Sequence, residues 1–379
     1  MYSFLHMSTQ PENSARRVFG LDLLRSFAIL SVLYGHFVKH MPPGSVFQEL
    51  SLFSGMVGVE LFFVLSGFLI GGIIVRQLAQ GRFSTPSDAT RFWSRRWYRT
   101  LPNYFLFLAL FYWLEPPEPG TVQRYLVFVQ NLYWPMGKFF SVSWSLAVEE
   151  WFYLLLPLPV VILAARGLGP KRTMIVALLV ILVTSLLASV AAPFQSQWAG
   201  FDNYQRKVVL VRLSSLMFGV GMVYIKFHHE QLWRSLSTLG VLSVLPLVAL
   251  HYLSFSVAAT SGWYLGSKAA QVAFFPLYSL SCSLVLPWLD SWRDAPGPVR
   301  DVFTWISDAS YAMYLCHIPT LLLLNKYVLN VDWYNMQTKR SSYMLAYFIG
   351  TFVVAGLTRK FWELPWLRYR DRVHPESGS

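Results

Sequence analysis

The sequence contains ten apolar segments, each long enough to cross a bilayer as a helix, and these restrict the fold more than any other feature. Each has roughly 17–24 residues, and about 20 apolar residues span the hydrocarbon core as an α-helix. They cover residues 21–38, 56–75, 98–114, 142–165, 173–192, 208–225, 236–254, 269–288, 307–325 and 343–361. Only 13% of the residues are charged, whereas soluble domains contain about 25%. The sequence therefore predicts an all-α polytopic membrane protein with about ten transmembrane helices.

The basic residues alternate between the segments that connect these spans. Most of the 31 Lys and Arg residues fall in the two termini and in every second connection, residues 76–97, 166–172, 226–235 and 289–306. Because basic residues mark the cytoplasmic side, this bias predicts that both termini lie inside. It also fits a bacterial inner membrane. The net charge of +12 is then explained by topology and by contacts with anionic lipid or phosphate rather than nucleic acid.

We expect one transmembrane domain over residues 19–372, flanked by disordered tails over residues 1–18 and 373–379. No cleavable signal peptide is expected, because the first span is followed by MPPGS rather than a cleavage site. Cys282 and Cys316 lie in apolar runs and are expected to be free thiols.

The first span contains three ionisable residues, which are costly inside a membrane and therefore indicate function. Arg25 and His36 are eleven residues apart, within about 20° of three whole turns, so they share one helix face roughly 16 Å apart. Asp22 lies one turn before Arg25 and is placed to pair with it. The alternative is that Asp22 and Arg25 reach the membrane interface and His36 ends the helix.

The second and third spans carry further polar groups. Glu60 lies within the apolar run GVELFFVLSGFLIGG and needs a buried Arg or His as its partner. The small residues of this run predict close helix packing. Arg96 and Arg99 are three residues apart and are neighbours on a helix face. Such a pair suits either lipid headgroups or bidentate recognition of phosphate on a nucleotide-bearing cofactor.

The fourth, sixth and ninth spans contain the remaining candidates. Glu149 and Glu150 follow a group of serines that includes Ser145, which is typical of a helix N-terminus. Adjacent acids point to different faces, so one is expected to face a polar cavity, and the sequence leaves open which one. Arg212 needs a partner or a cavity. His317 precedes Ile-Pro, and this position fits a buried structural polar group or a site residue.

In this order, these motifs resemble acyltransferase family 3 of integral membrane proteins. The matching features, from about residue 20 to 370, are Arg25-x10-His36, GVELFFVLSGFLI, Arg96-x-x-Arg99, WSLAVEEWFY, SYAMYLCHIP and FWELP. The resemblance implies a ten-helix core that transfers acyl groups, usually acetyl, from cytosolic acyl-CoA to a hydroxyl on a carbohydrate or another small acceptor. It also implies that Arg25 and His36 form the essential pair and that Arg96 and Arg99 handle the donor. It does not include the appended SGNH hydrolase-like domain that some members carry.

We therefore predict a membrane-embedded O-acyltransferase that uses acyl-CoA, most simply acetyl-CoA, and a carbohydrate or glycolipid acceptor in a lipid bilayer. Neither a metal nor a nucleic acid is expected as a partner. Imidazole is the usual base at neutral pH, so His36 is predicted to take the acceptor's proton or briefly accept the acyl group, with an acid such as Glu149 or Glu60 orienting it. The candidate residues are His36, Glu149, Glu150 and Glu60 as catalytic groups, Arg25, Arg96 and Arg99 as donor-binding groups, and His317, Arg212, Asp22 and Ser145 as substrate-binding or structural polar groups.

Two other classes of protein fit the same pattern. A proton-coupled transporter or flippase would also contain intramembrane Asp, Glu, His and Arg residues. A non-catalytic membrane sensor or scaffold would tolerate the loss of His36. The sequence leaves open the acceptor, the acyl chain length, the oligomeric state and the start of translation at Met1 or Met7.

Overall fold

The computed structural model describes residues 17–38, 46–255, 263–324, 326 and 340–374, and in these ranges every regular element is a helix. The longer helices are α1 (Phe19–Val38), α2 (Val46–Ala79), α3 (Pro86–Leu114), α5 (Ser143–Leu155), α6 (Pro157–Ala165), α7 (Pro170–Ala191), α9 (Val209–His228), α10 (Glu230–Thr238), α11 (Leu245–Phe255), α12 (Lys268–Ser283), α14 (Gly297–Leu323), α15 (Arg340–Thr358) and α16 (Leu364–Val373). The shorter elements are α4 (Val122–Leu126), α8 (Trp198–Phe201), η2 (Asp202–Arg206), η3 (Gly240–Val244), η4 (Trp263–Leu265), α13 (Leu286–Asp290) and η7 (Arg359–Glu363).

The expected N-terminal tail lies outside the described residues except for residues 17 and 18. The expected C-terminal tail lies outside them except for residues 373 and 374.

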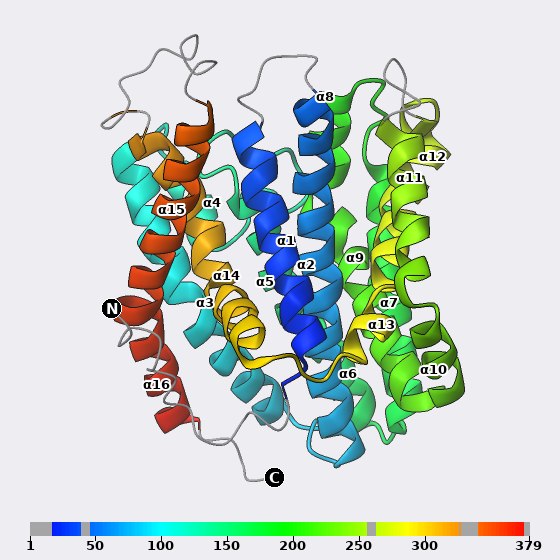
Figure 1. The fold of residues 1–379 in the computed structure, drawn as a ribbon. Coiled ribbons are helices and arrows are strands. Elements are labelled where there is room, and N and C mark those ends of the chain that lie inside the picture. The colour runs from blue at the N-terminus through cyan, green and yellow to red at the C-terminus, as the bar shows by residue number, and fades with distance from the viewer. Residues whose placement is uncertain (1–16, 39–45, 256–262, 325, 327–339, 375–379) are drawn as a thin grey trace.

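The long helices run side by side as a bundle, with α1 and α2 at its centre (Figure 1). Helix α1 packs against α2, α13 and α14, and α2 packs in turn against α9, α12 and α5. Helices α3, α14, α15 and α16 lie on one side of this central pair, and α7, α9, α11 and α12 lie on the other (Figure 1). The helix α14, from the C-terminal part of the chain, therefore lies beside the N-terminal helix α1.

Glycines allow α2 to approach both of its central neighbours closely. A Cβ on Gly58 would lie 2.6 Å from the carbonyl oxygen of Ala28 in α1. A Cβ on Gly67 would collide with the carbonyl of Leu216 in α9. Any larger residue would separate the helices, so the predicted role of these small residues in helix packing is confirmed.

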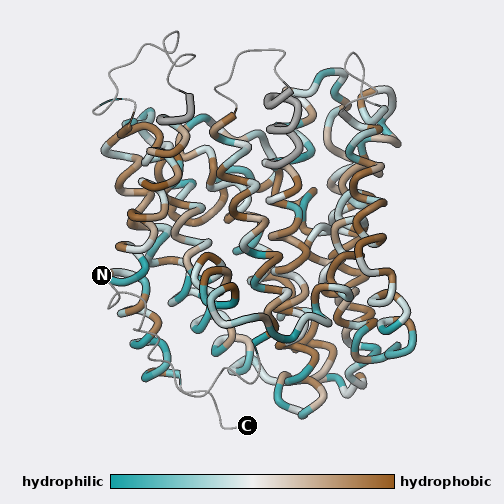
Figure 2. Tube along the Cα trace, in the orientation of Figure 1, coloured by the Kyte–Doolittle hydropathy of each residue, from teal (hydrophilic) through white to brown (hydrophobic). Residues whose placement is uncertain are grey.

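Seven helical stretches among the described residues are long and apolar enough to cross a membrane. They are Phe19–Val38, Gly55–Ala79, Ser143–Ala165, Pro170–Ala191, Val209–His228, Lys268–Asp290 and Tyr343–Val373. Glu230–Thr238 and Gly240–Ser254, bent by 96° at their junction, make an eighth if they count as one span. Figure 2 shows apolar residues along the middle of the helices and polar residues gathered at their ends. A helical, multi-span membrane protein is therefore confirmed.

Two of the ten expected spans are helices that fall short of this apolar standard. Expected span 98–114 lies in α3, which includes Arg99 and Asn103, and expected span 307–325 lies largely in α14, which includes Asp308 and His317. These polar side chains lower the mean hydropathy of helices that are otherwise long enough to cross.

Candidate active site

Helix α1 turns both of its central polar residues toward the same neighbours. Arg25 and His36 are half-buried. The His36 ring contacts His317 of α14, and Arg25 interacts electrostatically with Arg99 of α3 and Asp308 of α14. The His36–His317 contact and the charge interaction between Arg25 and Asp308 both involve α14, which agrees with the shared helix face that the eleven-residue spacing predicts.

Three arginines gather at the end of α1 that carries Arg25. The charges of Arg25, Arg96 and Arg99 act on one another, and all three side chains are half-buried. None of the three forms an ion pair with a residue that the structure describes. Like charges repel, so three guanidinium groups in one place favour a multiply charged anion between them.

The two adjacent acids of α5 face this arginine cluster. Glu149 interacts electrostatically with all three arginines, and Glu150 interacts with Arg96. The Tyr153 hydroxyl donates a hydrogen bond of 2.8 Å to Glu149 Oε2 and lies 2.5 Å from Ser66 Oγ. The Arg96 guanidinium lies 5.7 Å from the centroid of the Tyr153 ring. Tyr153 therefore contacts both Glu149 and Arg96.

The histidines of α1 and α14 form a pair. Their ring centroids are 4.8 Å apart, with an interplanar angle of 63°. His36 Nδ1 lies 3.0 Å from the Val32 carbonyl oxygen, and His317 Nδ1 lies 2.6 Å from the Tyr314 carbonyl oxygen. A carbonyl can only accept, so each Nδ1 carries a proton, and a neutral ring then has its basic lone pair on Nε2. Both rings are thus held in the tautomer that suits a general base.

Tyr314 connects the histidine pair to α5. Its carbonyl accepts the His317 bond, and its hydroxyl donates to the Val142 carbonyl oxygen at 2.9 Å. The same hydroxyl lies 2.5 Å from Ser145 Oγ. Ser145 is therefore close to the histidine pair through Tyr314, while Glu149, one turn further along α5, faces the arginines.

Glu60 lies in a different cluster, on the face of α2 that packs against α9 and α12. Its carboxylate pairs with Arg212, and both side chains are almost completely buried. Ser279 Oγ donates to Glu60 Oε2 at 2.9 Å and lies 2.9 Å from Ser215 Oγ. The Arg212 guanidinium lies 3.6 Å from the centroid of the Phe275 ring. Glu60 was expected to need a buried Arg or His, and Arg212 a partner or a cavity; the structure pairs them with each other.

Asp22 pairs with Arg17 rather than with Arg25. Arg17 Nη2 lies 2.9 Å from Asp22 Oδ1, and Ser307 Oγ donates to the same oxygen at 2.7 Å. Arg17 also reaches Asp308, which pairs in turn with Arg359 at 2.8 Å. No ion pair joins Asp22 and Arg25 among the described residues, because Arg17 and Ser307 occupy the Asp22 carboxylate, although its charge still acts on Arg25. Arg25 is left for the arginine cluster.

Sequence reasoning overlooked two tyrosines of the site. Tyr153 follows Glu149 by four residues and Tyr314 precedes His317 by three, both spacings that make neighbours on a helix. Both tyrosines lie within motifs that were singled out for other residues. The helical spacing from each candidate acid or histidine is the signal that identifies them.

At the other end of the bundle, Asp202 pairs with both Arg206 and Lys207. The Arg206 guanidinium also lies 4.9 Å from the Trp144 ring centroid, at the start of α5. Burial opposes ionisation of Asp202, but the two cations hold the pKa of its carboxyl below the usual value. This triad lies in η2 and at the residue that follows it, just before α9, and its Arg206 contacts Trp144 at the start of α5.

The described residues include no group of three or more His, Cys, Asp or Glu side chains placed to hold a metal ion. Cys282 and Cys316 are buried free thiols, as predicted. The polar groups that gather in the site are thus guanidinium, carboxylate, imidazole and hydroxyl groups.

The site and the fold define a multi-span helical membrane protein with an arginine cluster and a histidine pair in its interior. Residues 18–360 match the Acyl_transf_3 model, which describes an acyltransferase domain, and the chain belongs to this family. The predicted family, and the enzyme class at the level of that family, are confirmed.

Two relatives illustrate the similarity. O-acetyltransferase OatA of Staphylococcus aureus (strain NCTC 8325 / PS 47) is 24% identical over an alignment of 339 residues that covers 83% of this chain and 52% of the relative. The Bacillus subtilis (strain 168) protein named "Putative peptidoglycan O-acetyltransferase YrhL" is 28% identical over an alignment of 334 residues that covers 81% of this chain and 49% of that relative. The chain thus spans about half the length of both. No solved structure matches the chain.

Proposed function

We propose that the chain is a membrane-embedded O-acyltransferase that moves an acetyl group from cytosolic acetyl-CoA to a hydroxyl of a carbohydrate or glycolipid. The two relatives support this choice, because both carry the name O-acetyltransferase and one name specifies peptidoglycan. We further propose ten membrane spans with both termini inside, in a bacterial cytoplasmic membrane. The distribution of basic residues supports this topology.

The observation that carries the proposal is the His36–His317 pair on the same side of α1 as the arginine cluster. Acyl transfer from a thioester to an alcohol needs a base for the hydroxyl proton and cations for the donor's phosphates. Arg25 and His36 are separated by roughly 16 Å along α1. An extended thiol arm can bridge such a separation when its phosphates bind at the arginines.

The donor's phosphates are assigned to Arg25, Arg96 and Arg99. Guanidinium groups suit phosphate because their planar forks donate two parallel hydrogen bonds. These three arginines form no ion pair with a described residue, which supports this role. The donor's phosphates therefore do not have to displace a carboxylate in order to bind. Glu149, in electrostatic reach of all three, limits the repulsion among them while the donor is absent.

His36 Nε2 is assigned as the general base. It takes the proton from the acceptor hydroxyl, whose oxygen forms a bond to the thioester carbonyl carbon, and the carbon–sulfur bond then breaks. The proton passes to the departing thiolate, so the products are the acetyl ester and free coenzyme A. His317, with the same tautomer and a ring edge against His36, stabilises the charge that His36 gains. Glu149 and Tyr153 are assigned to the donor side of this step.

The decisive experiment follows label from radiolabelled acetyl-CoA in membranes that contain the wild type or His36→Ala. We expect label in an extractable glycan product with the wild type alone, at equal protein abundance. Equal labelling by His36→Ala would remove His36 from the chemistry. Substrate uptake that needs no acyl-CoA would instead identify a transporter.

A further inference from the structure

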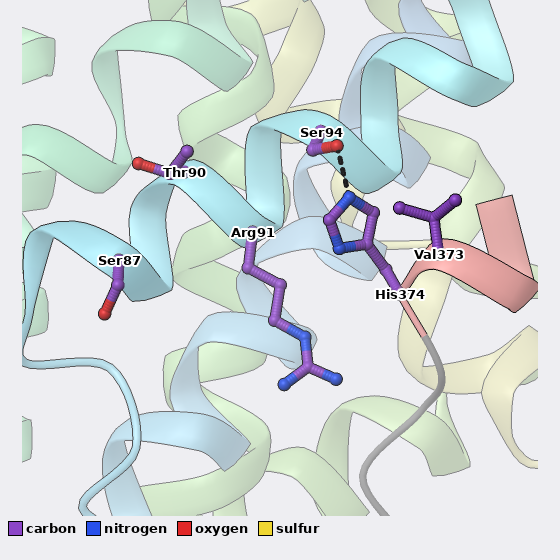
Figure 3. Close-up of a pocket in the computed structure, with 6 residues that line it drawn as sticks. All are labelled: Ser87, Thr90, Arg91, Ser94, Val373 and His374. Carbon is purple, nitrogen blue, oxygen red and sulfur yellow. Dashed lines mark hydrogen bonds between the residues drawn. The ribbon is translucent and has the colours of Figure 1, made fainter.

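Two features at one end of the bundle take no part in the proposed site. The first is a pocket of about 640 Å³ between the start of α3 and the end of α16, where Ser94 Oγ lies 2.6 Å from His374 Nε2 (Figure 3). This contact joins α16 to α3. The second is helix α10, which lies at the same end of the bundle as α6 and α16 (Figure 1). Its apolar and polar side chains lie on opposite sides of the helix.

Helix α10 does not continue in the direction of the helix that follows it. The segments Glu230–Thr238 and Gly240–Ser254 are bent by 96° at their junction. Gly240 makes this turn with a φ of +55°, a left-handed conformation that favours glycine. The nine residues of α10 rise only about 14 Å, less than half of a hydrocarbon core of about 30 Å. When Gly240–Ser254 crosses the bilayer, α10 therefore lies close to the plane of the membrane.

The sequence of α10 and of Leu239, which follows it, separates apolar from polar residues. At about 100° per residue, residues 232, 233, 236 and 239 fall within an arc of about 120°. They are Leu232, Trp233, Leu236 and Leu239. The opposite arc holds the charged and polar residues Glu230, Gln231, Arg234, Ser235, Ser237 and Thr238. A helix with such an apolar side and such a polar side is typical of a segment that lies in a membrane interface.

One edge of the apolar side rests on the bundle. Trp233 is 8% exposed and stacks on Phe68 of α2, with ring centroids 5.8 Å apart and an interplanar angle of 8°. Lys226 of α9 places its ammonium group 5.5 Å from the centroid of the Trp233 ring. Leu236, next to Trp233 in the arc, is half-buried. These contacts fix α10 against α2 and α9.

The other edge of the apolar side is exposed. Leu232 is 48% exposed and Leu239 is 42% exposed. The exposed side chains of Val241, Leu242 and Leu245 continue this apolar surface into the segment that follows the bend. Exposed apolar residues of a membrane-spanning segment face lipid. The exposed edge of α10 is therefore continuous with a lipid-facing surface.

The polar side of α10 needs water. Arg234 pairs with Glu230, and their side chains are 75% and 69% exposed. Moving an ion pair into hydrocarbon removes the hydration of both groups, and the attraction between them offsets only part of this cost. A helix with lipid at one edge and water on the opposite side lies at the boundary between acyl chains and headgroups.

We propose that α10 is an interfacial helix that binds the surface of the bilayer. Leu232 and Leu239 insert among the acyl chains next to the headgroups, and the polar side faces water. Trp233 holds the helix against the bundle. The expected span 236–254 then begins at Gly240, and the connection before it runs along the membrane surface.

Spin labels on single introduced cysteines measure the depth of α10, with the purified full chain in phospholipid nanodiscs. Collision rates of each label with oxygen, which concentrates in hydrocarbon, and with a water-soluble nickel chelate give its distance from the lipid phosphates. We expect Leu232→Cys and Leu239→Cys to place labels roughly 5–10 Å below the phosphates, and Arg234→Cys to place one above them. Cys282 and Cys316 are buried, so the wild type treated with the same reagent gives the background.

Two exposed positions serve as references. Val183→Cys in α7 reports the hydrocarbon, and Arg82→Cys, just before α3, reports water. Labels at Leu232 and Leu239 that match Arg82→Cys would put this edge in water, where a soluble protein partner would cover it, and would overturn the proposal. A label at Arg234 that matches Val183→Cys would place α10 inside the hydrocarbon and would equally overturn it. Depth is measured without acyl transfer, so the result is independent of the proposed function.

Discussion

The rings of His36 and His317 meet edge to face with their centroids 4.8 Å apart, although the two residues come from opposite ends of the chain. Each Nδ1 donates to a backbone carbonyl of its own helix. The helices α1 and α14 thus fix both rings independently, and the contact between them couples the two helices at one point. The consequences of this arrangement can be measured.

Replacing either histidine is expected to lower the acyl transfer rate without loss of protein. His317→Ala should reduce kcat by about 10²-fold, the usual lower range for a group that assists proton transfer. The double variant should be little worse than His36→Ala alone, because residues that act as a unit are not additive. His228→Ala, at the end of α9, is the control. Independent, multiplying losses in the double variant would show that the rings act separately.

The arginine cluster is expected to control the apparent KM for the acyl donor. Arg96→Ala and Arg99→Ala each remove charge-assisted bonds to phosphate, so each should raise KM about tenfold or more. Steady-state kinetics with acetyl-CoA give the values. Arg166→Ala removes an exposed arginine after α6 and should leave KM unchanged. A loss of kcat at constant KM would place these arginines outside the donor site.

Tyr153 is expected to act by holding Glu149. Tyr153→Phe removes the 2.8 Å bond to Glu149 Oε2 and leaves the ring in place. We expect about a tenfold loss of kcat/KM, equal to about 1.4 kcal/mol, and an unchanged melting temperature. Tyr125→Phe is the matched control, because it deletes a buried hydroxyl that donates to the Phe139 carbonyl oxygen at 2.6 Å, away from the acids. A similar loss in both variants would argue for a general packing effect.

The Glu60–Arg212 pair is expected to support stability rather than chemistry. Breaking a buried ion pair by removing one partner costs about 3–5 kcal/mol, because the other charge stays buried alone. Glu60→Gln and Arg212→Gln should each lower thermal stability strongly, and the double variant should lose less than the two single losses together. Thermal unfolding in detergent measures this. If Glu60→Gln lowered kcat at full stability, Glu60 would instead belong to the catalytic groups.

The Asp202 triad is expected to make stability depend on acid. The cations beside Asp202 lower the pKa of its carboxyl, so its contribution is present above the unfolded pKa and is lost as the pH falls through the lower folded value. Asp202→Asn should therefore cost about 2 kcal/mol at pH 7 and much less at about pH 2. Unfolding curves for both proteins at the two pH values test this. A constant difference would show that the carboxylate charge contributes nothing.

The sequence was most informative about residues that are close to each other along the chain. The shared face of Arg25 and His36 follows from helix geometry, and the motifs identified the family. Partners from distant segments could not be predicted in the same way. Glu60 was expected to need a partner and Arg212 a partner or a cavity, yet only the packing of α2 on α9 shows that they meet.

Two other differences have a common physical origin. The local rule favoured Asp22 with Arg25, but Arg17 and Ser307 occupy the Asp22 carboxylate in the fold. Hydropathy is weakest in α3 and α14 because they carry Arg99 and His317, polar residues of the candidate site. Hydropathy predicts membrane-spanning helices least reliably where a helix contributes polar residues to the interior of the bundle.

The glycine contacts of α2 also determine which parts of the bundle are able to move. Gly58 meets the α1 backbone, while Gly67 meets the carbonyl of Leu216 in α9 and Gly219 of α9 meets the carbonyl of Val64 in return. With backbones in direct contact, we expect α1, α2 and α9 to move together, and α1 carries Arg25 and His36. Under the proposed function, we expect substrates to enter by displacement of the surrounding helices α3, α5 and α14, which carry Arg99, Glu149 and His317. Closing of these helices would then bring the reacting groups of the proposed site together for each turnover.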